Sequence, residues 1–327
     1  MRRALILGYH RVVTSPRVDP LGRDLAIATS RFRRHMEILA RRFKIVPLDE
    51  LVARLAERAQ GPHVAAVTFD DGYADNYHCA FPVLSHLGIP ATIFLATEFV
   101  EHGRPFWWDR LAWYLCRRAG AVLSLPDELG GQADLTSVAG LRQTYRTVLG
   151  TLRVLDDGDA REAFLDALGA ERPPDGRPLT WEEVRSMHRQ GITFGAHTAT
   201  HPSLPAISDA ALSREIEASN RSIVARLQAH ATMFAYPFGD VAERVDKAVT
   251  AAGFRGAVTT RAGLCGPRTS AALLPRLIVD DWDAREFSHH LDRFGTAPQR
   301  ARRFALSLKA RIPPRAAAIV KSIRPWL

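Results

Sequence analysis

Four polar clusters hold the residue types that metal and acid–base chemistry requires. They are Tyr9-His10-Arg11, Asp70-Asp71-Gly72, His197-Thr198-Ala199-Thr200-His201 and Tyr236-Pro237-Phe238-Gly239-Asp240. Each cluster directly follows a short apolar run that is typical of a buried strand. Since the carboxyl ends of parallel strands meet at one face of a barrel, we expect the four clusters to converge there.

The Asp70-Asp71 pair can serve one site only where the chain turns, because successive side chains of a strand point to opposite faces. Gly72 permits such a turn. Two carboxylates this close repel each other, and a nearby cation would relieve the repulsion. Taken alone, the pair is more typical of a strand that ends in an Asp-Gly turn.

His197 and His201 are four residues apart, a spacing that on a helix often places two imidazoles on one metal ion. Pro202 disfavours a helical conformation at His201, so we expect a loop that wraps around the ligand. Two histidines alone would be ordinary core or turn residues. Joined with a carboxylate, they leave coordination positions open and predict one catalytic divalent metal ion, with zinc as the default and cobalt, nickel or iron as alternatives.

The elements that must position these residues alternate between strands and helices. Helical periodicity is clear after Ser30, the expected N-cap of a helix over 31–43, and after Ser208 or Asp209. The alternation predicts an α/β fold, an irregular (β/α) barrel of about seven parallel strands. The expected strands are 5–8, 65–69, 92–96, 192–196, 232–236, 256–259 and 277–279.

Two regions interrupt this alternation within the 327 residues. Residues from 101 to about 179 are too long for a connection and predict a mainly helical insertion in a barrel of residues 1–292. Its Trp107, Trp108 and Trp113 could stack on sugar rings or pack a small core of the insertion. Residues 293–327 form a basic tail, for which peripheral membrane contact and a helix packed on the barrel are both open.

Composition excludes several classes of protein. The net charge of +9 arises in the tail, which has nine basic and no acidic residues, so the body is neutral and no nucleic-acid partner is expected. No run of eighteen apolar residues occurs, which argues against a transmembrane helix. The amino terminus lacks the pattern of a signal peptide, so we expect a cytoplasmic protein, with the inner face of the membrane as an option. Cys79, Cys116 and Cys265 fit neither a disulfide framework nor a cysteine zinc site.

Three motifs resemble those of the polysaccharide deacetylase family, also called the NodB-homology domain or carbohydrate esterase family four. They are Thr68-Phe69-Asp70-Asp71-Gly72, His197-Thr198-Ala199-Thr200-His201 and Phe234-Ala235-Tyr236-Pro237-Phe238-Gly239. The resemblance runs from about residue 5 to 279, without most of the insertion. It implies a (β/α) barrel that removes N- or O-acetyl groups from sugars. It also implies Asp70 as catalytic base, Asp71, His197 and His201 as metal ligands, and the backbone N–H near Phe238 as part of an oxyanion hole.

Hydrolysis of an amide also needs a general acid for the leaving amine, which the family takes from a histidine in its last motif. His289 and His290 match that motif weakly, because they lie in an expected helix. Some members that act on glucosamine polymers have a permuted motif order with an amino-terminal Tyr-His segment. Gly8-Tyr9-His10-Arg11 resembles that segment, so we predict His10 as the acid. The alternative is a histidine that merely ends a strand.

One position departs from the family pattern. Many members carry, in the third motif, an arginine that orients the base, and this chain has Ala235 there. Arg276, at the start of the last expected strand, could supply that charge from elsewhere. Its other interpretation is an ordinary surface arginine.

The sequence thus predicts a metal-dependent N-deacetylase that acts on an amino sugar of a surface polysaccharide, as in exopolysaccharide biosynthesis, or on its lipid-linked precursor. Two other functions stay open. One is a catalytically inactive carbohydrate-binding homologue, against which the intact Asp70, Asp71, His197 and His201 argue. The other is a metal-dependent amidohydrolase that acts on a small non-sugar amide or imide.

Overall fold

A curled parallel sheet is the centre of the molecule. The computed structural model describes residues 4–16, 19–23, 25–57 and 63–296. The main strands are β1 (Ala4–Tyr9), β5 (Val64–Phe69), β6 (Ala91–Leu95), β9 (Thr193–Ala196), β10 (Met233–Ala235), β11 (Gly256–Val258) and β12 (Leu277–Ile278). They pair in the order β11–β10–β9–β6–β5–β1–β12, and β4 (Lys44–Ile45) pairs with β5. The predicted α/β class and the seven parallel strands are confirmed.

The two edge strands, β11 and β12, approach each other through the segment that joins them. Leu274 forms a parallel bridge with Val258, and the following strand pairs with β1 through Leu277 and Ile278. The Leu274 N–H donates to the Ala257 carbonyl at 2.8 Å, and the Thr259 N–H donates to the Leu274 carbonyl at 2.9 Å. β11 and β12 do not form a regular strand pair, so these hydrogen bonds connect the two edges of the curled sheet.

Both faces of the sheet are buried, as a parallel sheet requires. Leu5 and Leu7 of β1 pack outward in the same cluster as Phe32 and Met36 of helix α1 (Thr29–Arg42). Ile6, between them in sequence, belongs to a separate inner cluster, which is the expected consequence of side chains that alternate across a strand. The inner cluster combines small and large side chains, among them Ala4, Ala66, Phe94, Met233, Ala235 and Val258.

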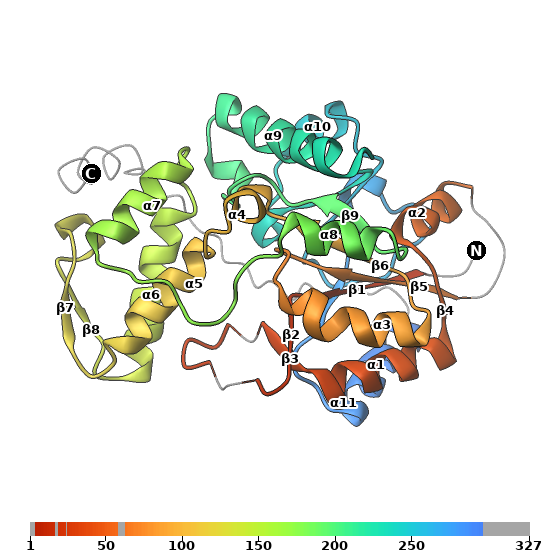
Figure 1. The fold of residues 1–327 in the computed structure, drawn as a ribbon, viewed down its shortest axis with the longest axis horizontal. Helices are drawn as coiled ribbons and strands as arrows, with labels where there is room; N and C mark the ends of the chain where they lie inside the picture. Colours follow the sequence, from red (N-terminus) through yellow and green to blue (C-terminus); the bar gives the residue numbers. More distant parts are fainter. Residues whose placement is uncertain (1–3, 17–18, 24, 58–62, 297–327) are drawn as a thin grey trace.

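Helices surround the sheet (Figure 1). They are α1 (Thr29–Arg42), α2 (Leu48–Ala56), α3 (Phe81–Leu87), α8 (Trp181–His188), α9 (Asp209–Leu227), α10 (Glu243–Ala251) and α11 (Ala284–Thr296). Ser208 caps α9 as expected, by accepting a hydrogen bond from the Ala211 N–H. The predicted Ser30 cap is wrong, because α1 begins at Thr29, two residues before the predicted start, so that Ser30 lies inside the helix and Ala28 is the N-cap. A short pair, β2 (Arg11–Val13) and β3 (Ala26–Ala28), lies beside α1.

The interrupting region forms its own group of elements at one end of the molecule, on the left in Figure 1. After α4 (Thr97–His102) come α5 (Trp107–Arg117), β7 (Val122–Ser124), β8 (Gln132–Asp134), α6 (Val138–Leu152) and α7 (Gly158–Ala167). The antiparallel β7–β8 pair was not expected from the sequence. Trp107 and Trp108 are 1% and 5% exposed and belong to the apolar core of this group, whereas Trp113 is half-buried.

The predicted basic tail begins inside α11, which continues to Thr296. Residues 297–327 lie outside the described residues. Among the helices that the structure describes, none combines the length and the apolar character needed to cross a bilayer.

Gly195 of β9 provides a test of the packing between the sheet strands. A Cβ atom at this position would lie 2.5 Å from the Phe94 ring and 2.8 Å from the Met233 carbonyl oxygen. We expect Gly195→Ala to lower the free energy of unfolding, measured in urea, by about 1–3 kcal/mol. Gly150→Ala is the control, since no described atom outside the nearby backbone of α6 lies within 4 Å of a Cβ there. It should be neutral or stabilising by up to about 1 kcal/mol, and equal effects of both changes would contradict this packing.

Candidate active site

The strand register brings three of the predicted clusters together. In β1 and β5, Tyr9 lies opposite Phe69, and the Asp70 N–H donates to the Tyr9 carbonyl at 2.9 Å. In β6 and β9, Leu95 lies opposite Ala196, and the His197 N–H donates to the Leu95 carbonyl at 2.9 Å. His10, Asp70, Asp71 and His197 therefore follow neighbouring strands at the carboxyl edge of the sheet.

Asp71, His197 and His201 form a cluster whose ligand atoms all lie within 4.8 Å of one another. The Asp71 Oδ1 atom is 3.5 Å from His197 Nε2 and 3.4 Å from His201 Nε2. The two Nε2 atoms are 3.2 Å apart. The histidines come from an irregular loop of residues 197–201, as expected from Pro202. We call this segment the ligand loop.

A carbonyl group fixes the orientation of His197. The Nδ1 atom lies 2.7 Å from the Ala235 oxygen, which can only accept a hydrogen bond, so Nδ1 carries the proton. The lone pair of the neutral ring is then on Nε2, which faces Asp71 and His201. Metal-binding histidines are commonly oriented by a hydrogen bond of this kind from the second ring nitrogen.

The charge balance of the cluster favours a divalent cation. Burial raises the pKa of Asp71 well above its usual value, and the neighbouring Asp70 carboxylate raises it further. Burial also lowers the pKa of both histidines, which keeps the imidazoles neutral. One carboxylate and two neutral imidazoles are a donor set that zinc and related metals bind. The residues present thus fit the metal ion that the sequence predicts.

Unusual backbone conformations gather around the cluster. Asp71, Thr198, His201 and Phe238 have φ angles of 71°, 66°, 60° and 59°. Such angles are costly for residues other than glycine and persist where surrounding contacts impose them. One of these contacts is the Thr198 hydroxyl, which accepts from the His201 N–H at 3.0 Å.

Asp70 is held by Arg276. Its two carboxylate oxygens accept hydrogen bonds from Nη1 and Nη2 of the guanidinium at 2.7 and 2.6 Å. Arg276 is completely buried, and its Nε atom donates to the Thr259 carbonyl at 3.0 Å. Burial alone would raise the pKa of Asp70, but the charge and the hydrogen bonds of Arg276 outweigh it and hold this pKa well below its usual range. The surface interpretation of Arg276 is therefore wrong.

Small residues make room for this guanidinium inside the barrel. A Cβ atom on Gly8 would lie 3.4 Å from the Arg276 guanidinium and 2.7 Å from Ile278. Ala235, the position that carries an arginine in many members of the resembled family, lies in the same apolar interior. Arg276 reaches Asp70 from the segment before β12.

His10 lies beside Asp70, with 4.0 Å between His10 Nε2 and Asp70 Oδ2. Asn76 fixes the chain here, since its side-chain amide donates to the His10 carbonyl at 2.8 Å. Burial lowers the pKa of His10 to about 4, against the opposing influence of the Asp70 charge. Tyr9, in contrast, packs in the core against Phe32 and Phe69.

Two aromatic rings cover His201. The Trp108 ring centroid is 4.4 Å from that of His201, and the Phe238 ring meets it edge-on at 4.7 Å. Trp108 Nε1 donates to the Tyr73 hydroxyl at 2.9 Å, which joins the insertion to the turn after Asp71. The role of the Phe238 N–H in an oxyanion hole stays a prediction.

Sequence reasoning missed Glu215. This buried residue of α9 accepts hydrogen bonds from the Ala199 and Thr200 N–H groups at 2.9 and 2.8 Å and from the Thr200 hydroxyl at 2.5 Å. It thereby holds the middle of the ligand loop. A signal was available, because Glu215 stands beside Ile216 on the buried stripe of α9 that includes Leu212 and Ser219.

Comparison with known proteins agrees with this fold. A family model described as polysaccharide deacetylase matches residues 57–257, more than half of the chain. The chain belongs to the polysaccharide deacetylase family.

Individual relatives share the fold at low sequence identity. Streptococcus pyogenes deacetylase PplD, solved in complex with acetate, is 16% identical with a TM-score of 0.62, over 90% of this chain and 99% of that one. IcaB from Ammonifex degensii is 18% identical with a TM-score of 0.59, over 90% and 97% of the two chains. The Bacillus subtilis (strain 168) protein YxkH, whose name places it among polysaccharide deacetylases, is 30% identical over 99 residues, which is 30% of this chain and 33% of that protein. The match thus spans about a third of the length of that relative.

Replacement of Asp71 should separate the stability of the metal-free protein from metal binding. Asp71→Asn removes a buried carboxylate beside Asp70, so we expect an equal or higher thermal midpoint in chelator. Zinc should raise the thermal midpoint of the wild type, because a hundredfold excess over Kd adds about 2.7 kcal/mol to the free energy of unfolding. It should leave the midpoint of the variant unchanged. Calorimetric unfolding measures both effects.

Asp75→Asn is the matched control, because Asp75 is paired with Arg11 at 2.8 Å and lies outside the cluster. It should keep the zinc-induced shift. A zinc-induced shift that Asp71→Asn retains would show that the ion binds elsewhere.

Proposed function

We propose that the protein is a metal-dependent N-deacetylase that acts on an N-acetylated amino sugar of a surface polysaccharide or of its lipid-linked precursor. The observation that carries the proposal is the position of Asp70. This buried carboxylate, ionised by Arg276, lies 4.0 Å from the His10 ring and directly precedes Asp71 of the Asp71–His197–His201 cluster. A base, a second titratable group and a set of metal ligands are thus adjacent in one site.

Asp71, His197 and His201 would hold one divalent ion, with zinc as the first choice and cobalt, nickel or iron as alternatives. Such an ion lowers the pKa of a bound water and polarises the acetyl carbonyl. The geometry of His197 supports this assignment, since its Nδ1–H bond to Ala235 directs Nε2 toward the other two ligands.

Asp70 is the proposed base that takes the proton of the attacking water. Arg276 keeps it in the ionised form that can accept a proton, and the bidentate contact fixes the plane of the carboxylate. The arginine is therefore a positioning residue, which fulfils from the segment before β12 the role that Ala235 cannot.

His10 is the proposed acid that protonates the leaving amine. With a pKa of about 4 its ring is neutral at pH 7 in the free protein, so it must gain a proton during the reaction. Asp70 lies 4.0 Å away, so the proton that it receives from the attacking water would reach His10 through one bridging water or after a closer approach of the two side chains. The backbone N–H of Phe238 would complete the stabilisation of the oxyanion.

The polysaccharide substrate class follows from the family, and one solved relative supports the acetyl group as the reacting part. PplD is a deacetylase that was solved with acetate. The amino-sugar substrate, a role in exopolysaccharide biosynthesis, a cytoplasmic location and contact of the basic tail with the inner face of the membrane are proposals that biochemical work must test.

Acetate release from N-acetylglucosamine oligomers tests the function directly. Chelator-stripped protein should be inactive, and added zinc, cobalt or nickel should restore release. Asp70→Asn should lower the restored rate by at least about 100-fold, as removal of a general base does. Absence of release with metal demonstrably bound would contradict the proposal and direct attention to a non-sugar amide or imide or to a binding role.

Arg276→Gln tests whether the arginine controls the base. Without the guanidinium, burial dominates and raises the pKa of Asp70, so the ionised fraction falls first at acidic pH. We expect the acid limb of the kcat/KM profile for acetate release to move to higher pH, and the loss of rate to be greater at acidic than at alkaline pH. The free energy of unfolding should fall by about 3–5 kcal/mol.

Arg261→Gln is the control, because this nearby side chain is exposed. Its pH profile should match that of the wild type. An unchanged acid limb in a folded, active Arg276→Gln protein would exclude the proposed role of Arg276.

A further inference from the structure

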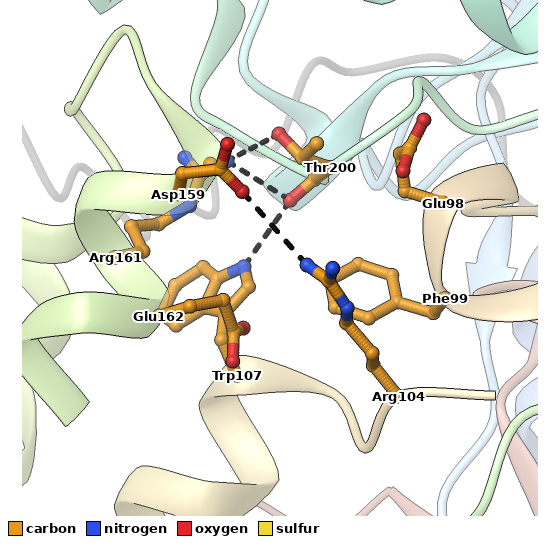
Figure 2. Close-up of a pocket in the computed structure, with 9 residues that line it drawn as sticks. Glu98, Phe99, Arg104, Trp107, Asp159, Arg161, Glu162 and Thr200 are labelled. Carbon is orange, nitrogen blue, oxygen red and sulfur yellow. Dashed lines mark hydrogen bonds and ion pairs between the residues drawn. The ribbon is translucent and has the colours of Figure 1, made fainter. Parts of the chain in front are cut away.

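The insertion contacts the ligand loop at Thr200. Arg161 of α7 donates from Nη2 to the Thr200 carbonyl at 3.2 Å and also to the Thr200 hydroxyl. Trp107 of α5 donates from Nε1 to the same carbonyl at 3.3 Å. Figure 2 shows both side chains directed at Thr200 beside a small pocket. Thr200 directly precedes the predicted metal ligand His201.

Arg161 is buried at a cost that these contacts must offset. It is 1% exposed, and burial lowers the pKa of its guanidinium while the charge of Glu215 opposes this effect. A buried charge is unfavourable unless it is paired and hydrogen-bonded. Besides Thr200, Nη1 donates to the Leu155 carbonyl at 3.2 Å. An arginine at this buried position is therefore unfavourable for stability unless these hydrogen bonds compensate for the loss of hydration.

The Thr200 hydroxyl connects Arg161 to Glu215. It donates to Glu215 Oε1 at 2.5 Å and accepts from Arg161. The hydroxyl proton therefore points toward Glu215. The cation of the insertion and the anion of α9 thus hold the loop from two sides. Charge-assisted hydrogen bonds of this kind are stronger than neutral ones.

The connection between α6 and α7 also packs against the ligand loop and the residues that follow it. The Arg153 carbonyl accepts from the Ser203 N–H at 2.7 Å, and Asp156 accepts from the Ser208 N–H at 3.0 Å. A Cβ atom on Gly158 would lie 2.9 Å from the Thr200 methyl group. Contacts between the two histidines, at Thr200, and after them, at Ser203 and Ser208, therefore involve the insertion.

We propose that Arg161, supported by Trp107, is a positioning residue of the metal centre, through which the insertion sets the affinity for the metal ion. The inference rests on the proposed metal site. His201 has a φ of 60°, a conformation that its neighbours must impose, and Thr200 is the adjacent residue that Arg161 restrains. Loss of the restraint lets His201 leave the position in which its Nε2 atom lies near Asp71 and His197.

Metal affinity, measured by calorimetric titration of the chelator-stripped full chain with zinc, tests the inference. We expect Arg161→Met to weaken binding by about 10- to 100-fold, the usual effect of losing an outer partner of a metal ligand. Thr200→Val, which keeps the side-chain shape and removes the hydroxyl, should weaken binding as well. The visible spectrum of the cobalt-loaded protein should change in both variants.

Arg110→Met is the matched control. Arg110 is also a buried arginine of the insertion, but it pairs with Glu162 and Asp166 and does not contact the ligand loop. We expect it to lower the thermal midpoint and to leave the zinc affinity and the cobalt spectrum unchanged.

The outcomes separate this inference from the proposed function. If the wild type binds no metal, the metal centre itself is wrong. If the wild type binds zinc and folded Arg161→Met and Thr200→Val bind it equally well, the positioning role is overturned. An equal loss of affinity in Arg110→Met would overturn it too, because the effect would then reflect only the stability of the insertion.

Discussion

Asp70 and Asp71 are adjacent carboxylates that are both buried, and each needs a positive partner. Arg276 is the partner of Asp70, through two short hydrogen bonds. Among the described residues, no lysine or arginine forms an ion pair with Asp71, which instead faces the neutral rings of His197 and His201. This division explains the site: one carboxylate is kept ionised by a fixed cation, and the other is available to a metal ion.

The barrel makes this division possible by leaving space in its interior. The small side chains at Gly8 and Ala235 and the chain segment before β12 allow a complete guanidinium to lie among apolar residues. The carbonyl of Ala235 also orients His197. A position at which family members often carry the arginine thus contributes here through its backbone and its lack of bulk.

The sequence predicted the fold well because its signals are local. Seven short apolar runs became the seven strands of the main path, and the clusters that follow them meet through strand register. The buried stripe of α9 indicated a buried carboxylate at Glu215 but not its partners on the ligand loop. The contacts of Arg161 were not predictable, because they join residues that are far apart in sequence and leave no spacing pattern. The β7–β8 pair was missed because strands of three residues are too short to show alternation. Burial of Trp107 and Trp108 favours the packing interpretation of these side chains, although Trp108 also covers His201.

The central claim is that a metal ion and Arg276 divide the two carboxylates between them. A crystal structure of the zinc-loaded protein, with anomalous data collected at the zinc edge, tests it most directly. We predict one strong peak in bonding distance of an Asp71 oxygen and the Nε2 atoms of His197 and His201, with Asp70 still bound to Arg276. A peak coordinated by Asp70 instead of Asp71, or a fully loaded protein with no ion in this cluster, would contradict the account.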